Sequence, residues 1–467
     1  MGHSMADHPD RLLPADPGVR DIARSLFKKV EGLPIISPHG HVDAAVIEQN
    51  TPFPDPAALL VTPDHYVTRL IHAGGVPLDQ LGLGSGPADS RQVWRHFCAA
   101  WPQFEGTASG YWIRQEFAHV FGLPEEPSAE NADRLYDALQ AKLSEPGFRP
   151  RELFKEFNIE VLATTDDPLD SLDSHAALQA DPSFAARVLP TFRPDQYLNM
   201  AHPSWQDNVE RLIGSAGDGA SGYAGYIKAL EARRRHFVER GAVSADHGVF
   251  TPTTLKLDDA EAERLFERGR SGQASAADRS AFEAHMIYQM ARMSVEDGLV
   301  MTIHPGSFRN HHAPTFEAFG ADTGHDIPVA VNYTEAVRPL LQDFGTAKDF
   351  HLVLFTLDET VFSRELAPLA GFYPSVYLGA PWWFLDAPDA MLRFRSAVTE
   401  TAGFSRSSGF IDDTRAFCSI PARHDTARRI EASFLARMVA EHRITEERAH
   451  ELIVEIIDDS PRRVFKL

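Results

Sequence analysis

Two histidines separated by one residue, His39 and His41, follow a short apolar run near the start of the sequence. In an extended segment residues i and i+2 point to the same side, so both imidazoles can face one ion. Imidazole nitrogen suits zinc, and two histidines with one carboxylate leave a coordination position open for water or substrate. Because the chain holds 21 histidines, this pair gains weight only from its position in the fold.

Eight short apolar runs have the length of buried strands, and helical patterns lie between most of them. The runs cover residues 33–36, 159–164, 188–192, 242–245, 299–303, 350–356, 375–378 and 409–411. Helices are expected over residues 16–29, 151–157, 168–180, 205–240, 275–297, 332–344, 360–370, 387–402, 423–440 and 444–456. Alternating strands and helices form parallel sheets, and eight repeats without a glycine fingerprint favour a closed barrel over an open sheet. We therefore predict an α/β fold, a (β/α)₈ TIM barrel.

The regular alternation is interrupted once, after the first strand. Residues 51–150 are rich in proline, glycine and aromatic side chains and show helical spacing without a convincing strand. We interpret them as a helical insertion subdomain. Residues 1–50 then hold the N-terminal helix and first strand, and residues 151–467 the remainder of the barrel with two C-terminal helices.

Groups able to bind metal, move protons or hold an anion follow nearly every predicted strand. They are His39 and His41, Thr164 to Asp167, Arg193, Asp246 and His247, His304 and Arg309, Asp358, Trp382 and Trp383, and Asp413 with Arg415. In a TIM barrel the residues after the carboxyl ends of the strands line the active site. The pattern therefore indicates an enzyme. Asp413 follows the last strand, which neighbours the first in a closed barrel, so we expect it to complete the metal site.

Several of these residues also have a purely structural interpretation. Arg193 could pair with Asp195 instead of clamping a carboxylate, and Asp246 could serve in a turn. From spacing alone, His65 and Tyr66 look like the start of a surface helix.

Composition narrows the function classes. With 45 basic and 66 acidic residues the formal charge is −21, which argues against nucleic acid and anionic membranes as partners, since both require basic surfaces. Two cysteines exclude a disulfide framework, and the first residues contain no apolar stretch typical of a secretion signal. We expect a cytoplasmic protein, and a homo-oligomer.

An ordered set of motifs resembles one known family. The motifs are Ser37-Pro38-His39-Gly40-His41, Asp64-His65-Tyr66, Ala163-Thr164-Thr165-Asp166-Asp167-Pro168, Thr191-Phe192-Arg193-Pro194-Asp195, Ala245-Asp246-His247-Gly248 and Asp413-Thr414-Arg415. Together they resemble the uronate isomerase family, also called glucuronate isomerase, of the amidohydrolase superfamily. The resemblance extends from about residue 30 to residue 430.

The resemblance implies a metal-assisted aldose–ketose isomerase that interconverts D-glucuronate with D-fructuronate, and D-galacturonate with D-tagaturonate, through a cis-enediol. It implies metal ligands His39, His41 and Asp413 and further active-site positions His65, Tyr66, Arg193, Asp246, His304 and Arg415. Among these we expect Asp413, Tyr66, His65 and Arg415 to be catalytic, and Arg193, Asp246 and His304 to contact the substrate together with Trp382, which follows the seventh predicted strand. The sequence departs from the family with Gly40 between the histidines and in the loop after His304. No lysine is obvious at the end of strand four, so one divalent metal, with zinc as the expected ion, is predicted.

Two other functions fit parts of the pattern. A single-metal hydrolase on the same scaffold would act on an acidic small molecule and release hydrolysed products. A silent sugar-acid binding protein would bind uronates without turnover, although the set of His39, His41, Asp413 and Arg415 argues against it.

Overall fold

The central strands of the molecule are parallel and belong to two sheets. The computed structural model describes residues 8–84, 86 and 88–467, so residues 1–7 of the first predicted segment lie outside the described residues. The strands are β1 (Ile35–Ser37), β2 (Ile159–Ala163), β3 (Arg187–Leu189), β4 (Thr191–Phe192), β5 (Ser244–Val249), β6 (Val300–Pro305), β9 (Leu352–Leu354) and β10 (Val376–Leu378). Their order is β1-β2-β3 in one sheet and β10-β9-β6-β5-β4 in the other.

β3 and β4 connect the two sheets on one side. They are consecutive parts of one extended segment, interrupted at Pro190, which has no backbone N–H to donate to a neighbouring strand. β3 pairs with β2 and β4 pairs with β5, both in parallel. A bridge between Asp166 and Phe192 continues the pairing from the end of β2 to β4.

The segment before Asp413 closes the ring on the other side. The Ser408 N–H donates to the Leu378 carbonyl at the end of β10 (2.8 Å), and the His41 N–H after β1 donates to the Thr414 carbonyl (3.0 Å). Residues 407–414 therefore take the eighth position of the barrel, between β10 and β1. The predicted (β/α)₈ barrel is confirmed.

Two details of the predicted strands differ from the structure. The eighth run, residues 409–411, lies where a strand is expected but forms no regular ladder, since its hydrogen bonds to the neighbours fall at its ends. The first strand is Ile35–Ser37 instead of residues 33–36. A short antiparallel pair, β7 (Ser307–Phe308) with β8 (Ile327–Pro328), also follows β6 and supports the loop beyond it.

The helices of the barrel largely follow the predicted pattern. They are α9 (Asp173–Ala180), α10 (Asp195–Leu198), α11 (Trp205–Ala216), α12 (Gly222–Glu239), α13 (Asp259–Arg270), α14 (Ala276–Asp297), α15 (Ala313–Phe319), α16 (Arg338–Phe344), α17 (Ala367–Phe372) and α18 (Pro388–Ala402). The single helix predicted over residues 205–240 is wrong, because Asp218 (φ +50°) and Gly219 (φ +74°) take left-handed conformations that end α11. Helix α13 was not predicted.

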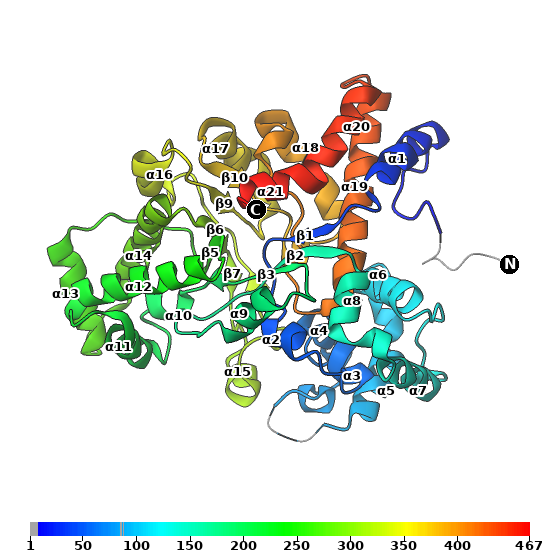
Figure 1. Ribbon diagram of the computed structural model, residues 1–467, viewed down its shortest axis with the longest axis horizontal. Coiled ribbons are helices and arrows are strands. Elements are labelled where there is room, and N and C mark those ends of the chain that lie inside the picture. The colour runs from blue at the N-terminus through cyan, green and yellow to red at the C-terminus, as the bar shows by residue number, and fades with distance from the viewer. Residues whose placement is uncertain (1–7, 85, 87) are drawn as a thin grey trace.

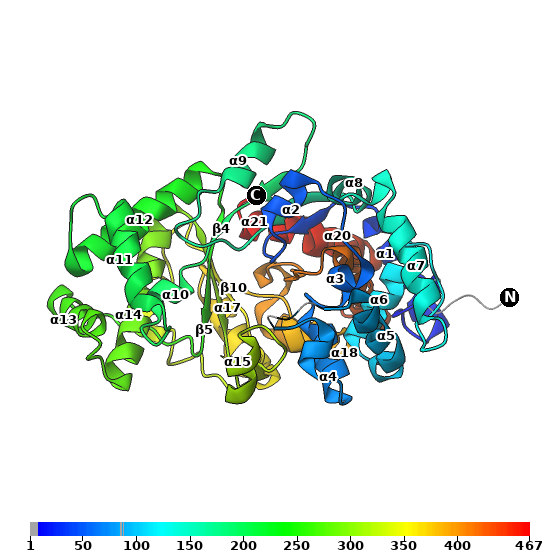
Figure 2. The same cartoon turned by 90° about the horizontal axis from the view of Figure 1, so that it is seen from below.

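The segment interpreted as an insertion, residues 51–150, holds the helices α3 (Pro56–Leu60), α4 (His65–Ala73), α5 (Ser90–Ala100), α6 (Ala108–Gln115) and α7 (Ala132–Leu143). Helix α2 (Ala44–Gln49) precedes it, and α8 (Pro150–Glu156) follows where a helix of the barrel is expected. Figures 1 and 2 show α3 to α7 grouped on one side of the barrel, with α11 to α14 on the opposite side. Several buried aromatic residues of the insertion, among them Trp94 and Phe97, belong to one apolar cluster with Ile35 of β1 and Leu162 of β2. The insertion thus shares a core with the barrel.

The two ends of the chain pack together. The N-terminal helix α1 (Pro17–Val30), capped by Asp16, buries Leu26 in a cluster with Leu435 of α19 (Ile420–Ala440) and Leu452 of α20 (Glu446–Val454). The short helix α21 (Ser460–Val464) ends the chain. No helix in the described ranges is long and apolar enough to cross a membrane.

Candidate active site

A cavity of about 300 Å³ lies at the carboxyl ends of the strands. Its walls combine residues that follow β1, β4, β6, β10 and the eighth segment with residues from the insertion. The predicted site residues that line it are His39, His41, His65, Tyr66, Arg193, His304, Trp382, Asp413 and Arg415. The tenth predicted residue, Asp246, lies behind this wall. The folded chain thus gathers residues that are up to 376 positions apart in the sequence, from His39 to Arg415.

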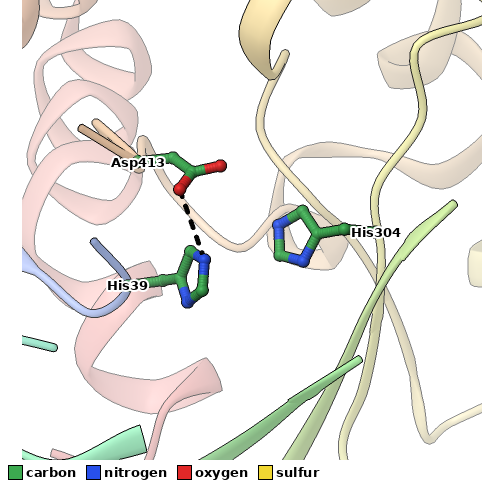
Figure 3. A group of neighbouring side chains, drawn as sticks. All are labelled: His39, His304 and Asp413. Carbon is green, nitrogen blue, oxygen red and sulfur yellow. Dashed lines mark ion pairs between the residues drawn. The ribbon is translucent and has the colours of Figure 1, made fainter. Parts of the chain in front are cut away.

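Two histidines and one aspartate form a cluster suited to a metal ion. His39, His304 and Asp413 each place a possible ligand atom within 4.8 Å of those of the other two, and Figure 3 shows their side chains converging. His39 Nε2 lies 3.3 Å from Asp413 Oδ1, and His41 Nε2 lies 2.8 Å from the same oxygen. Asp413 is therefore shared by both histidines of the pair, while His304 takes the third position of the tight cluster.

Unsatisfied polar atoms support the same assignment. His304 Nε2 is buried and has no hydrogen-bond partner among residues 8–84, 86 and 88–467, and the neighbours of Asp413 Oδ1 are the imidazole nitrogens of His39 and His41. Leaving one such atom without a partner costs about 1–3 kcal/mol. Imidazole nitrogens and carboxylate oxygens are the donors that zinc and similar divalent ions accept. This donor set fits a divalent metal ion, and the cluster can hold one.

The charges at the cluster oppose the effect of burial. Burial alone would raise the pKa of Asp413, but His39 and His41 lower it well below its ordinary value. Burial lowers the pKa of His41, whereas at His39 the carboxylates of Asp246 and Asp413 outweigh burial and raise the pKa. Asp413 is thus ionised at neutral pH, as a metal ligand or a base must be.

Asp246 supports the cluster from below. It is fully buried on β5, and its Oδ1 accepts hydrogen bonds from His304 Nδ1 and Thr302 Oγ1, both at 2.6 Å. The bond to Nδ1 fixes the orientation of the His304 ring and leaves its other nitrogen, Nε2, for the cluster. Its Oδ2 lies 3.2 Å from Arg193 Nη1. Asp246 is expected to contact the substrate, and in the structure it contacts His304 and Arg193, two residues that line the cavity.

Arg193 pairs with Asp195 and at the same time lines the cavity. Its Nε donates to Asp195 Oδ2 (2.8 Å), as in the structural interpretation, and its side chain also lines the cavity. Gly248 makes this approach possible, because a Cβ there would lie 2.5 Å from Arg193 Nη2. The paired carboxylates of Asp195 and Asp246 raise its pKa despite burial. Arg193 is a fixed cation beside the metal cluster.

The insertion supplies the outer wall. His65 and Tyr66 begin helix α4, and the Asp64 side chain caps it by accepting from the Tyr66 N–H (2.9 Å). The helix start agrees with the spacing, but the surface location suggested by spacing alone is wrong, because Tyr66 is 8% exposed. Burial raises the pKa of Tyr66, while burial, followed by the charge of Arg415, lowers the pKa of His65 to about 3. Tyr66 is therefore protonated, and His65 neutral, at neutral pH.

Sequence reasoning missed one residue of the wall entirely. Asp322, in the loop between β7 and β8, lines the cavity and places Oδ2 3.4 Å from Arg415 Nη2 and Oδ1 3.8 Å from Arg309 Nη1. Arg309 and Trp383, which follow predicted strands, also line the cavity. Nothing in the spacing around Asp322 distinguishes it from the other acidic residues of this chain, except its place in a glycine-containing loop.

Comparisons with known proteins agree with this geometry. The family model of glucuronate isomerase matches residues 18–465. A uronate isomerase of Corynebacterium efficiens is 58% identical, with 100% of both chains covered. The crystal structure of glucuronate isomerase from Caulobacter crescentus has a TM-score of 0.97 at 45% identity, covering 99% of this chain and 98% of that one. A uronate isomerase structure from Thermotoga maritima has a TM-score of 0.92 at 29% identity, covering 98% and 99%. This chain therefore belongs to the glucuronate isomerase family.

Proposed function

We propose that this chain interconverts D-glucuronate with D-fructuronate, and D-galacturonate with D-tagaturonate, in the cavity described above. The observation that carries the proposal is the convergence of the His39–His304–Asp413 cluster, a protonated tyrosine and two arginines on one cavity of about 300 Å³. An aldose–ketose isomerisation moves a proton from C2 to C1 and another between O2 and O1 through a cis-enediol. It requires an acid/base, a donor for the oxygens and a binding site for the carboxylate.

We assign one divalent ion, zinc, to ligands His39, His41 and Asp413. The shared oxygen, Asp413 Oδ1, lies 3.3 Å and 2.8 Å from the two Nε2 atoms, so both imidazoles adjoin the carboxylate that would bind the ion with them. His304, held by Asp246, is close enough to add its Nε2 as a further ligand or to donate to a substrate oxygen. When bound, such an ion supplies Lewis-acid polarisation of a substrate oxygen.

The acid/base residues are assigned from their protonation states. Asp413 is ionised and accepts the proton of a sugar hydroxyl during ring opening. Tyr66 keeps its proton at neutral pH and donates it to the substrate oxygen on which negative charge develops, and neutral His65 accepts or returns a proton beside it. The rings of His65 and Tyr66 are stacked with centroids 5.0 Å apart, which allows both to reach neighbouring atoms of one substrate.

Cations in the cavity recognise the acidic substrate. The protein carries a formal charge of −21, so recognition of an anion depends on groups within about 10 Å of it. We assign the substrate carboxylate to Arg193, which lies next to the metal cluster, and hydroxyl contacts to Arg415 at the outer end. Trp382, whose ring centroid is 4.8 Å from that of His304, supplies an apolar wall.

The direct test is incubation of the protein with D-glucuronate and zinc, followed by NMR in H₂O and in D₂O. We expect the ketose D-fructuronate in both solvents. Exchange of the C2 proton with solvent would appear as deuterium in the D₂O sample, while the product formed in H₂O keeps the mass of the substrate. A hydrolase would instead release fragments from an ester, lactone or amide, and lack of any ketose with metal supplied would reject the proposal.

We propose a homo-oligomer that acts in the cytoplasm. Size-exclusion chromatography with light scattering tests the first part, since the chain mass is 51.8 kDa and an oligomer must elute with a multiple of it. A monomer at micromolar concentration would contradict the proposal.

A further inference from the structure

A buried arginine outside the cavity contacts two of the elements that carry the proposed catalytic groups. Arg423 lies in the first turn of α19 and is 1% exposed. Its guanidinium carbon lies 3.8 Å from the centroid of the Trp112 ring and 5.1 Å from that of the Tyr66 ring. Those two rings meet edge to face, 5.8 Å apart. The cation therefore packs against α6 and against the tyrosine at the start of α4.

The same guanidinium is held by polar groups from the C-terminal part of the barrel. Nη1 donates to Asp386 Oδ2 (2.8 Å) and to the Asp412 carbonyl (3.2 Å), and Nε donates to Ser419 Oγ (3.1 Å). A planar guanidinium can make these bonds in its plane while its faces contact aromatic rings, which an ammonium group cannot do. Arg423 thus joins the insertion to the segment that carries Asp413.

The backbone at Asp413 explains why this contact matters. Asp413 has φ of +42°, in the left-handed region that L-residues rarely adopt. Hydrogen bonds fix the backbone before and after it: the Asp412 carbonyl, in the peptide group that precedes Asp413, accepts from Arg423, and the Thr414 carbonyl, in the peptide group between Thr414 and Arg415, accepts from the His41 N–H. Between these two bonds the Asp413 carboxylate lies against His39 and His41.

We infer that Arg423 is a positioning residue, which holds the Tyr66 ring and the Asp413 turn in the relative placement that proton transfer requires. The inference rests on the function proposed above. Arg423 does not line the cavity, so it acts through these two residues. Asp64 of the helix cap, Asp386 and Asp413 also surround Tyr66 with negative charge, and the positive charge of Arg423 opposes them.

The test compares Arg423→Met and Arg423→Lys with a matched control, Arg395→Met. Arg395 matches Arg423 in its surroundings: it is buried, pairs with the carboxylate of Glu431, and has its guanidinium 5.9 Å from the Phe404 ring. Like Arg423, it does not line the cavity. With D-glucuronate we expect kcat to fall at least tenfold in Arg423→Met, with KM within threefold of wild type. Arg423→Lys should recover part of the loss, and Arg395→Met should keep wild-type kcat even if its melting temperature falls.

A double-mutant cycle with Tyr66→Phe separates positioning from general destabilisation. If Arg423 acts through Tyr66, the kcat loss of the double variant is smaller than the product of the single losses. Multiplicative losses, or wild-type kcat in folded Arg423→Met, overturn the inference. If Arg423→Met does not fold, the cycle is run with Arg423→Lys under the same criteria. Failure of the wild-type protein to isomerise D-glucuronate would instead reject the proposed function.

Excess metal in the assay distinguishes a further outcome. Metal content of each variant is measured after dialysis, and kcat is measured with and without added zinc. A loss in Arg423→Met that zinc restores completely would mean that only metal retention depends on the arginine, and would overturn its role at Tyr66. A loss that persists in the fully loaded variant supports positioning.

Discussion

Replacing Asp246 with asparagine should weaken metal binding, although the substitution changes none of the proposed ligands themselves. The carboxylate accepts from His304 Nδ1 and Thr302 Oγ1 at 2.6 Å and lies 3.2 Å from Arg193 Nη1. An amide has one acceptor oxygen, so in Asp246→Asn its NH₂ group must face the donors of Thr302, His304 or Arg193. With His304 Nε2 as the further ligand proposed above, the loss of its orienting group corresponds to a 10- to 100-fold weaker metal affinity, equivalent to about 1.4–2.8 kcal/mol.

The stability of the metal-free protein should fall as well. Breaking a buried ion pair by removing one partner costs about 3–5 kcal/mol, and we expect the lower end because Arg193 retains its bond to Asp195. Zinc affinity is measured by competition with a chromophoric chelator, and stability by urea unfolding of the metal-free protein.

Asp297→Asn is the matched control for this experiment. Asp297 Oδ2 accepts from Nε of the buried Arg234 (2.6 Å), and neither residue lines the cavity. It should lower stability and leave zinc affinity unchanged. The reasoning fails if Asp246→Asn binds zinc within twofold of wild type, or if Asp297→Asn weakens binding to the same extent.

Three further changes have defined outcomes. Asp413→Asn should reduce kcat for D-glucuronate by at least about 10³-fold while circular dichroism shows an intact fold; near-normal turnover would exclude Asp413 as acid/base. Arg193→Met should raise KM for uronates by about 10- to 100-fold, as expected for a lost hydrogen bond to a charged group, and should leave any activity on neutral aldoses less affected; an equal loss for both would exclude it as the carboxylate site. Glu116 is 3% exposed and burial raises its pKa to about 8, so the native state binds a proton that the unfolded state releases above its ordinary pKa. Stability should therefore decline as pH rises from about 4.5 to about 8, and urea unfolding of Glu116→Gln should show a flatter decline over that range; an unchanged slope would contradict the assignment.

Much of the site could be predicted because barrel geometry restricts where side chains converge. Once alternating strands and helices indicate a barrel, residues after the strands must meet at one face. His39, Arg193, His304 and Asp413 were found in this way. Their exact partners could not be found, because contacts such as that between His304 and Asp246 depend on neighbouring strands and their register.

The metal cluster shows that strand alternation predicts side-chain direction only within the strand itself. The alternation of side chains places His39 and His41 on one side only while the segment remains a strand, and β1 ends at Ser37. Beyond it the backbone turns, and the two rings lie edge to face with centroids 5.3 Å apart. Which histidine completes the tight cluster is decided by this turn, which the sequence pattern does not specify.

Residues from the insertion and from irregular loops had weaker signals. Spacing predicts a helix that begins at His65, but its burial depends on how the insertion folds back over the barrel, which the motif resemblance indicated and periodicity did not. The eighth strand was expected to be regular, yet residues 407–414 are positioned by hydrogen bonds at their two ends. Arg423 has no local signal, because its partners are distant in sequence.

The closure of the barrel between the two ends of the chain sets the order in which activity can arise during synthesis. Tyr66 leaves the ribosome early, whereas Asp413 and Arg423 follow some 350 residues later. At typical rates of about 5–20 residues per second, this interval is at least about 17 seconds. Throughout it the apolar surface of α1 that packs on α19 and α20 has no partner. A nascent chain that stops before residue 413 lacks the shared carboxylate and cannot form the site, so catalytic competence requires translation beyond that residue.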